Sequence, residues 1–100
     1  MDTAEKTGKD LVGQKLCACV NILPGMTSIY RWQGAVETDR EVVMIIKTRA
    51  ALAVAVFAAV KAGHPYQTPA LLVVPVEGGS ADYLDWIETS TAFRGGPEDA

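Results

Sequence analysis

Two long extended segments are the feature that most constrains the fold of this chain. Residues 16–23 form a short, mostly apolar run, and the extended pattern continues over residues 26–36. Pro24-Gly25 between them is typical of a bulge or bend within a strand. Residues 37–40 (Glu-Thr-Asp-Arg) indicate a polar turn, and the apolar run over residues 41–47 suits a central strand. The sequence therefore predicts a long hairpin.

Three helices and one further strand are expected around this hairpin. Apolar side chains recur at helical spacing over residues 3–15, with charges between them. Residues 49–62 are alanine-rich and helical by their length, with Thr48 as the expected N-cap and Gly63 as the C-cap. Residues 71–76 predict a strand, in which Pro75 marks an edge or an end.

The C-terminal third contains a loop, a short helix and a tail. Residues 64–69 hold two prolines and predict a rigid loop. Gly78-Gly79-Ser80 caps a short helix whose apolar stripe we expect to dock onto the sheet or a neighbour: Tyr83, Leu84, Trp86 and Ile87. Residues 94–100 are polar and predict a flexible tail, which leaves residues 1–93 as a single domain.

The charge and composition of the chain limit the classes of partner that it can bind. Nine Lys and Arg stand against 12 Asp and Glu among the 100 residues, without runs, so the net charge of −3 offers no footprint for nucleic acid or anionic lipid. The apolar run over residues 50–60 is shorter than the roughly 20 residues that cross a membrane. The N-terminus lacks a signal-peptide pattern, and two cysteines make no disulfide framework. We therefore expect a cytoplasmic, reduced protein with no membrane or nucleic-acid partner.

The order of the expected elements predicts the fold class. Helix, strand, long hairpin to strand, helix, strand and helix together favour an α+β fold with helices packed on one face of a mainly antiparallel sheet. This order is similar to a ferredoxin-like βαββαβ unit without its first strand. The sequence thus predicts a sheet with one unfilled position.

Five segments in order resemble the CutA family of divalent-cation tolerance proteins. Each alone is a weak signal, but together they cover residues 3–91 at family-like spacing. The matching segments are Ala18-Cys19-Val20-Asn21-Ile22, residues 24–34 (PGMTSIYRWQG), residues 41–48, His64-Pro65-Tyr66 and Asp82-Tyr83-Leu84-Asp85-Trp86.

The resemblance implies a ferredoxin-like (PII-like) fold assembled as a homotrimer. It also implies a small cytoplasmic protein tied to copper and other divalent-metal tolerance, with no established enzymatic reaction, and for this chain we expect weak metal binding rather than catalysis. We therefore expect copper or another divalent metal as ligand and copies of the same chain as partners. Two alternatives stay open: a PII-like regulator that binds a small anionic metabolite in intersubunit clefts through Lys47 and backbone amides, and a purely structural trimer.

The chain departs from the family pattern at several points. The family's first strand precedes the helix that begins here near Thr3, so the natural chain starts upstream, is shortened, or completes its sheet in another way. Bacterial members proposed to bind copper place a Cys on that strand and a second His at the position of Gly63. Cys17 stands where Ala is usual, and Gln67 where many relatives carry Glu.

His64, Cys19 and Cys17 are the candidate metal ligands. Cys17-Ala18-Cys19 would place two thiols on one face of a strand, and thiolates favour Cu(I) and Zn(II). The simpler interpretation is that both are small buried apolar residues. His64, the one histidine, follows a helix C-terminus and suits either a metal ligand or a C-cap that orders the loop.

The resemblance further implies a pocket between subunits. A lysine at a strand end is ordinarily solvated, and aromatic residues on one strand face commonly serve as interface packing. Both interpretations stay open for this set. The residues that the family pattern places in or near the pocket are Asn21, Tyr30, Trp32, Lys47, Tyr66 and Gln67.

Overall fold

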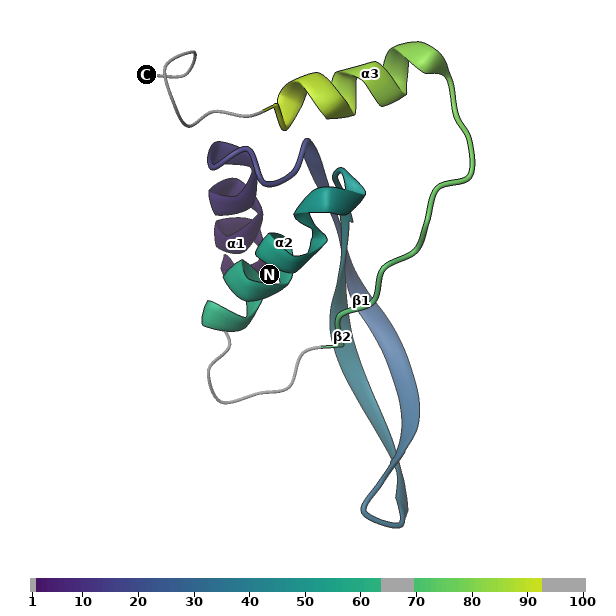
Figure 1. Cartoon of the computed structure of the whole chain (residues 1–100). Helices are drawn as coiled ribbons and strands as arrows, with labels where there is room; N and C mark the ends of the chain where they lie inside the picture. The colour runs from purple at the N-terminus through teal and green to yellow at the C-terminus, as the bar shows by residue number, and fades with distance from the viewer. Residues whose placement is uncertain (1, 64–69, 93–100) are drawn as a thin grey trace.

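A twisted antiparallel hairpin is the longest part of the structure, a computed structural model that describes residues 2–63 and 70–92. Its strands are β1 (Cys19–Trp32) and β2 (Ala35–Lys47), which form a two-stranded sheet. The pairing runs from Cys19 opposite Lys47 to Trp32 opposite Ala35. The base of the hairpin lies under the helices, and its far half projects away from them (Figure 1).

The bulge in β1 is where the sequence predicts it. The register shifts between Leu23 and Met26, so Pro24-Gly25 adds one residue to β1, and Gly25 adopts a φ of +76°. Glycine reaches this left-handed conformation without steric cost. The proline lacks an N–H, and a bulge is one of the few strand positions that tolerates this loss.

The hairpin turn is not at residues 37–40, and that prediction was wrong. Residues 37–40 lie within β2 and pair with residues 27–30. The chain reverses instead at Gln33-Gly34, with φ values of 50° and 83°. Two adjacent left-handed residues make the tight turn whose twist matches the paired strands. Polar residues fit β2 because this half of the hairpin is exposed, so polarity there is no turn signal.

Two helices cover one face of the hairpin base. Helix α1 (Asp2–Gly13) lies over β1, and a methyl group on Gly8 would be 3.4 Å from Val20 Cγ1, so the glycine permits a close approach. Helix α2 (Ala53–Ala62) packs beside α1 (Figure 1). The buried core between these elements consists of Leu11, Leu16, Cys17, Val56 and Val60.

The start of the second helical segment differs from the sequence prediction. Residues 50–52 form a 3-10 turn (Ala50–Leu52) ahead of α2, and Arg49 is the residue before it. Thr48 is not the N-cap; its hydroxyl donates a 2.6 Å hydrogen bond to the Leu16 carbonyl. The hydroxyl therefore joins the end of β2 to the turn after α1. Gly63 does follow α2 as its C-cap.

Residues 71–76 are extended but form no strand, which corrects the sequence prediction. Leu71 packs against the core, whereas Leu72, Val74 and Val76 are 86%, 82% and 75% exposed. A strand exists only through its hydrogen-bonded neighbour, and none of the described residues pairs with this segment. Its β-branched composition is therefore insufficient by itself.

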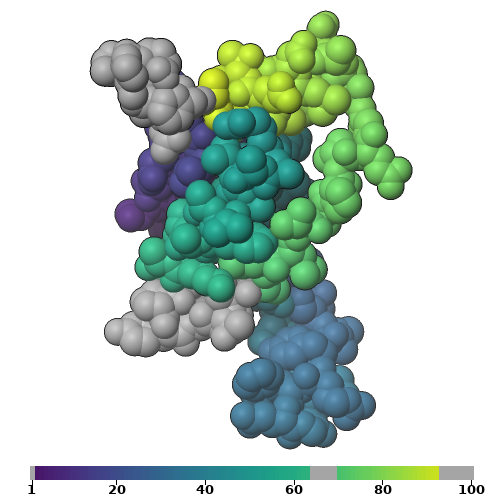
Figure 2. Space-filling model, in the orientation of Figure 1, coloured from purple at the N-terminus to yellow at the C-terminus, as the bar shows by residue number. Residues whose placement is uncertain are grey.

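Helix α3 (Ala81–Ser90) crosses one end of the molecule (Figures 1 and 2). Its N-cap is Ser80, as the sequence predicts, and the Ser80 hydroxyl accepts a 3.4 Å hydrogen bond from the Tyr83 N–H. Its C-terminal end is held by buried Thr91, whose Oγ1 accepts a 2.9 Å hydrogen bond from Arg49 Nε. Arg49 Nη2 also donates to the Thr91 carbonyl.

We expect Thr91→Val to lower the free energy of unfolding by about 1–2 kcal/mol, because the Arg49 donor loses its hydroxyl acceptor in a buried place. Urea unfolding followed by circular dichroism measures this change. Thr89→Val, at an exposed position of α3, is the matched control and should change stability little. Equal losses in both variants would contradict the anchoring role of Thr91.

Candidate functional site

The face of the hairpin opposite α1 and α2 carries the candidate site residues. Val20 and Ile46 pack toward the core, and successive side chains of a strand alternate between faces. Cys19, Asn21 and Lys47 therefore lie on the opposite face, which we call the open face. Lys47 is directly opposite Cys19 in the register, where cross-strand side chains approach one another.

Lys47 is held by Tyr83 of α3, which itself pairs with Trp86. Its Nζ donates a 3.2 Å hydrogen bond to the Tyr83 hydroxyl and lies 5.5 Å from the centre of the Tyr83 ring. The ring centres of Tyr83 and Trp86 are also 5.5 Å apart. The hydrogen bond to Tyr83 raises the pKa of Lys47, so the ammonium stays charged at neutral pH. This end of the open face thus presents a positioned cation.

Sequence reasoning assigned Tyr83 and Trp86 only to an apolar docking stripe. Their spacing of three residues places both rings on one side of a helix, which signals an aromatic pair but not its partner. The structure identifies that partner as Lys47. A cation over an aromatic face is favourable, so Tyr83 orients the lysine as well as docking α3.

The two cysteines lie in different surroundings. Cys19 begins β1 and is partly buried, and its thiol lies 3.8 Å from the Asn21 side-chain oxygen as a weak donor. Cys17 precedes β1 and lies in the core, so the expectation of two thiols on one strand face was wrong. Burial raises the pKa of Cys17 to about 11, which keeps it a thiol at neutral pH. Its placement matches the apolar interpretation.

Tyr30 and Trp32 lie at the far end of the hairpin. Nine residues of strand separate Tyr30 from Asn21, which corresponds to about 30 Å. Trp32 is 61% exposed, and Ile29 and Val36, on the other face of the same end of the hairpin, are 71% and 65% exposed. A single chain therefore does not bring Tyr30 and Trp32 together with Asn21 and Lys47. His64, Tyr66 and Gln67 fall outside the described residues, as does the predicted tail.

The described residues contain no preformed metal centre. Residues 2–63 and 70–92 hold no group of three or more His, Cys, Asp or Glu side chains placed to bind one ion. Cys19 and Asn21 offer one sulfur and one oxygen, fewer than the four ligands of a structural zinc site. Any metal site that uses Cys19 needs ligands from elsewhere.

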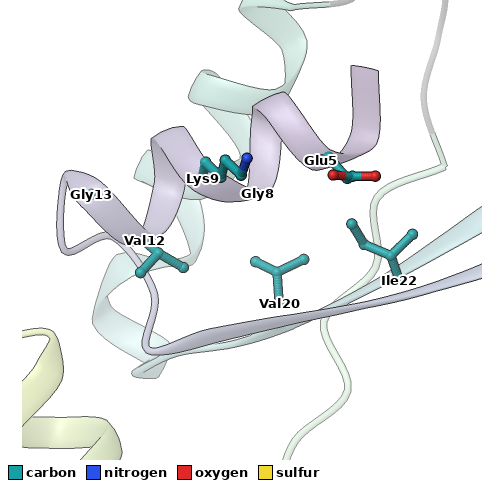
Figure 3. A pocket seen from close by; sticks show the side chains of 7 residues that line it. All are labelled: Glu5, Gly8, Lys9, Val12, Gly13, Val20 and Ile22. Carbon is teal, nitrogen blue, oxygen red and sulfur yellow. The ribbon is translucent and has the colours of Figure 1, made fainter. Parts of the chain in front are cut away.

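A shallow apolar groove of about 460 Å³ lies between α1 and β1 (Figure 3). Val12 points into it from α1, and Val20 and Ile22 point into it from β1, while Glu5 and Lys9 lie at its helix side. Apart from the Glu5 and Lys9 side chains its surface is aliphatic. The groove is thus suited to packing and offers little for chemistry.

The sequence model of the CutA1 divalent ion tolerance protein family matches residues 1–90. The chain belongs to the CutA family. The divalent-cation tolerance protein CutA of Citrobacter koseri is 46% identical over 88 residues, which cover 88% of this chain and 76% of that protein. The chloroplastic CutA 1 of rice (Oryza sativa subsp. japonica) is 42% identical over 90 residues, 90% of this chain.

The chain spans about half the length of the plant relatives, 51% for the rice protein. Among solved structures, CutA from Xylella fastidiosa has a TM-score of 0.86 and 41% identity, over 92% of this chain and 88% of that one. This similarity confirms the predicted α+β, ferredoxin-like fold. No helix within residues 2–63 and 70–92 has the length and apolarity to span a bilayer.

The Tyr30 hydroxyl donates a hydrogen bond to the Asp39 carboxylate, which raises the pKa of Tyr30 to about 12. Of the three tyrosines, we expect this one to ionise near pH 12 in an ultraviolet titration of the folded protein. In the unfolded chain Tyr30 ionises near pH 10. The contribution of its hydrogen bond to the stability of the fold is therefore fully present below pH 10 and is lost as the pH rises to about 12. In Asp39→Asn the Tyr30 pKa should fall toward 10; an unchanged titration would contradict the contact.

Proposed function

We propose that this chain acts in cellular tolerance to divalent metal ions. The observation that carries the proposal is the match of residues 1–90 to the CutA1 family, together with relatives whose names state divalent-cation tolerance. The plant relatives are named chloroplastic, so compartments differ within the family. For this chain we propose a cytoplasmic, reduced setting, because Cys17 and Cys19 are both free thiols.

We further propose that the protein binds ligands rather than catalysing a reaction. A general acid or base works best with a pKa near the operating pH. The pKa of Cys17 is raised to about 11 and that of Tyr30 to about 12, and the pKa of Lys47 is also raised, so all three move away from neutrality. These groups suit binding: an ammonium, an exposed phenol and thiols.

The assembly that we propose is a homotrimer built on the hairpin. A two-stranded hairpin with both faces in solvent is at best marginally stable by itself. Its far half exposes apolar side chains on both faces, Trp32 on the open face and Ile29 and Val36 on the other, and a neighbouring chain would cover Trp32. Packing the tip of one chain against the open face of the next would bring Tyr30 and Trp32 to Asn21 and Lys47. Tyr66 and Gln67 would complete this intersubunit pocket.

We expect the wild-type chain to have the mass of three 10.7 kDa subunits in light scattering on a sizing column. Trp32→Glu should give mainly monomer, because a charge would then be buried at the subunit contact. Val54→Glu introduces the same charge at a 79% exposed site on α2 and should stay trimeric. A wild-type monomer, or a trimeric Trp32→Glu variant, would refute hairpin-driven assembly.

For the metal we propose copper, weakly held by Cys19 with His64, while Cys17 contributes only if the core opens. Cys19 is partly buried and at the sheet end, whereas Cys17 is 1% exposed. Thiolate and imidazole are ligands that suit copper. This ligand pair is incomplete within the described residues, which is consistent with weak binding or with ligands from a second subunit.

In competition with a Cu(I) chelator, we expect Cys19→Ser and His64→Ala each to weaken copper affinity at least about tenfold. Cys17→Ser should leave affinity nearly unchanged, since this thiol is buried and protonated. Unaltered affinity in Cys19→Ser would exclude the proposed site. If Cys17→Ser alone lost affinity, the core thiol would be the ligand instead.

A PII-like regulator is the second candidate, and the fixed charge of Lys47 favours it. A small anionic metabolite in the intersubunit pocket would raise the melting temperature of the protein. Lys47→Met should abolish that rise without affecting the stabilisation by copper. Copper stabilisation should show the reverse dependence and disappear in Cys19→Ser. A purely structural trimer would show no stabilisation by either ligand. A ligand that does bind, present at 100 times its Kd, would stabilise the protein by about 2.7 kcal/mol.

A further inference from the structure

The far half of the hairpin carries opposite charges on its two faces. The even-numbered positions of β2 lie on the side of Ile46, which packs toward the core, and beyond the bulge they pair with odd-numbered positions of β1. The carboxylates Glu37, Asp39 and Glu41 therefore lie on the open face. The opposite surface of the far half, which we call the arginine face, consists of Thr27, Ile29, Arg31, Val36, Thr38 and Arg40.

The arginine face is exposed, and its two guanidinium groups have no acidic partner within residues 2–63 and 70–92. The salt bridge that the structure shows in this part of the chain joins Lys6 to Asp10. Ile29 and Val36 lie beside the arginines and are largely in solvent. A surface that combines two cations with apolar side chains matches a partner that is both acidic and partly apolar.

Among the described helices, α3 alone carries only acidic charges. Helix α1 contains both acids and bases, and α2 contains no acid. Asp82, Asp85 and Glu88 of α3 are exposed and recur at a spacing of three, which places them along one side of the helix. Leu84 and Trp86, 37% and 45% exposed, flank this acidic side. Helix α3 thus has the chemistry that the arginine face requires.

Within one chain the two surfaces lie at opposite ends of the molecule (Figure 1). Helix α3 is held at the base of the hairpin, where Tyr83 contacts Lys47, whereas Arg31 pairs with Val36 near the turn. The strand from Cys19, opposite Lys47, to Arg31 spans about 40 Å. An ion pair between the arginine face and α3 therefore requires two chains.

The docking of these surfaces rests on the proposed homotrimer, which brings them together. In that assembly the tip of one chain lies on the base of the next chain's open face, the end at which Tyr83 holds α3 to Lys47. A tip whose open face lies on that sheet has its arginine face directed away from the sheet, toward the neighbouring helix. A trimer joins two different surfaces at each contact, so the surfaces must be complementary rather than alike.

We propose that the arginine face of one chain docks against the acidic side of α3 of a second copy, where Arg31 and Arg40 pair with the carboxylates of Asp82, Asp85 and Glu88. Guanidinium groups bind carboxylates through two parallel hydrogen bonds, which fix the orientation of the partners as well as attracting them. The apolar side chains of the two surfaces meet beside these pairs. Helix α3 then clamps the hairpin tip of its neighbour.

The first test is a cross-link without a spacer in the full chain. Arg31→Lys and Arg40→Lys keep the positive charge and supply an amine, which a carbodiimide joins to a carboxylate in direct contact. Trimers are assembled from chains labelled with two nitrogen isotopes, and mass spectrometry identifies the joined peptides. Peptides that combine both isotopes should join the introduced amine to Asp82, Asp85 or Glu88. The wild-type chain, whose guanidinium groups do not react, is the control.

Light scattering of the same samples separates this docking from the proposed trimer. A trimer whose introduced amines join only Glu37, Asp39 or Glu41, or no carboxylate, would overturn the docking on α3 and leave the homotrimer standing. Cross-links to α3 that never combine the two isotopes would overturn it as well, because they would lie within one chain. A monomer would overturn both.

Charge reversal measures how much the contact contributes to assembly. Arg31→Glu/Arg40→Glu should speed the exchange of subunits between isotope-labelled trimers at least about tenfold, because like charges would then face each other. Adding Asp82→Arg and Asp85→Arg to this variant should restore the wild-type exchange rate. Rapid exchange in the variant with all four substitutions would overturn the proposal.

Lys15→Glu/Lys61→Glu is the matched control for the charge reversal. It makes the same change in net charge at exposed positions outside both surfaces, and its exchange rate should equal that of the wild type. If Arg31→Glu/Arg40→Glu exchanged no faster than this control, the arginine face would not be a subunit contact and the proposal would be wrong.

Discussion

A small apolar core at the hairpin base holds the described structure together. Leu11 of α1 and Val56 and Val60 of α2 meet Leu16 and Cys17 there, and Val20 and Ile46 close the core from the sheet. A short chain buries a smaller fraction of its surface than a large one, so such a core stabilises little beyond the elements it touches. The far half of the hairpin, residues 71–76 and most of α3 lie outside it. These regions need other contacts.

That distribution of contacts explains why the candidate site residues lie apart. Asn21 and Lys47 are at the supported end of the hairpin, and Tyr30 and Trp32 are at the unsupported end. In the homotrimer that we propose, neighbouring chains would bring them together. The exposed apolar tip and the open face are costly in water for one chain, and they would become part of the interior of such an oligomer.

Much of the fold could be predicted because it depends on local patterns. Apolar periodicity located α1, and alanine content and length located α2. Ser80 marked the start of α3, and Pro24-Gly25 located the bulge. Two errors came from composition. The charged residues 37–40 resembled a turn but lie in an exposed strand, and residues 71–76 resembled a strand but have no described partner. In both cases the deciding factor was the surroundings of the segment rather than its residues.

The sequence by itself determined the family, the α+β class and the residue types available for binding, because helical spacing, bulge chemistry and ordered motifs are all local properties. Only the tertiary structure decided how those residues are grouped. It placed Cys17 in the core and Cys19 at the sheet surface, two residues apart, and it set Tyr83 against Lys47 from 36 positions away. Burial and long-range contact depend on where the whole chain folds back upon itself, which no short window of sequence contains.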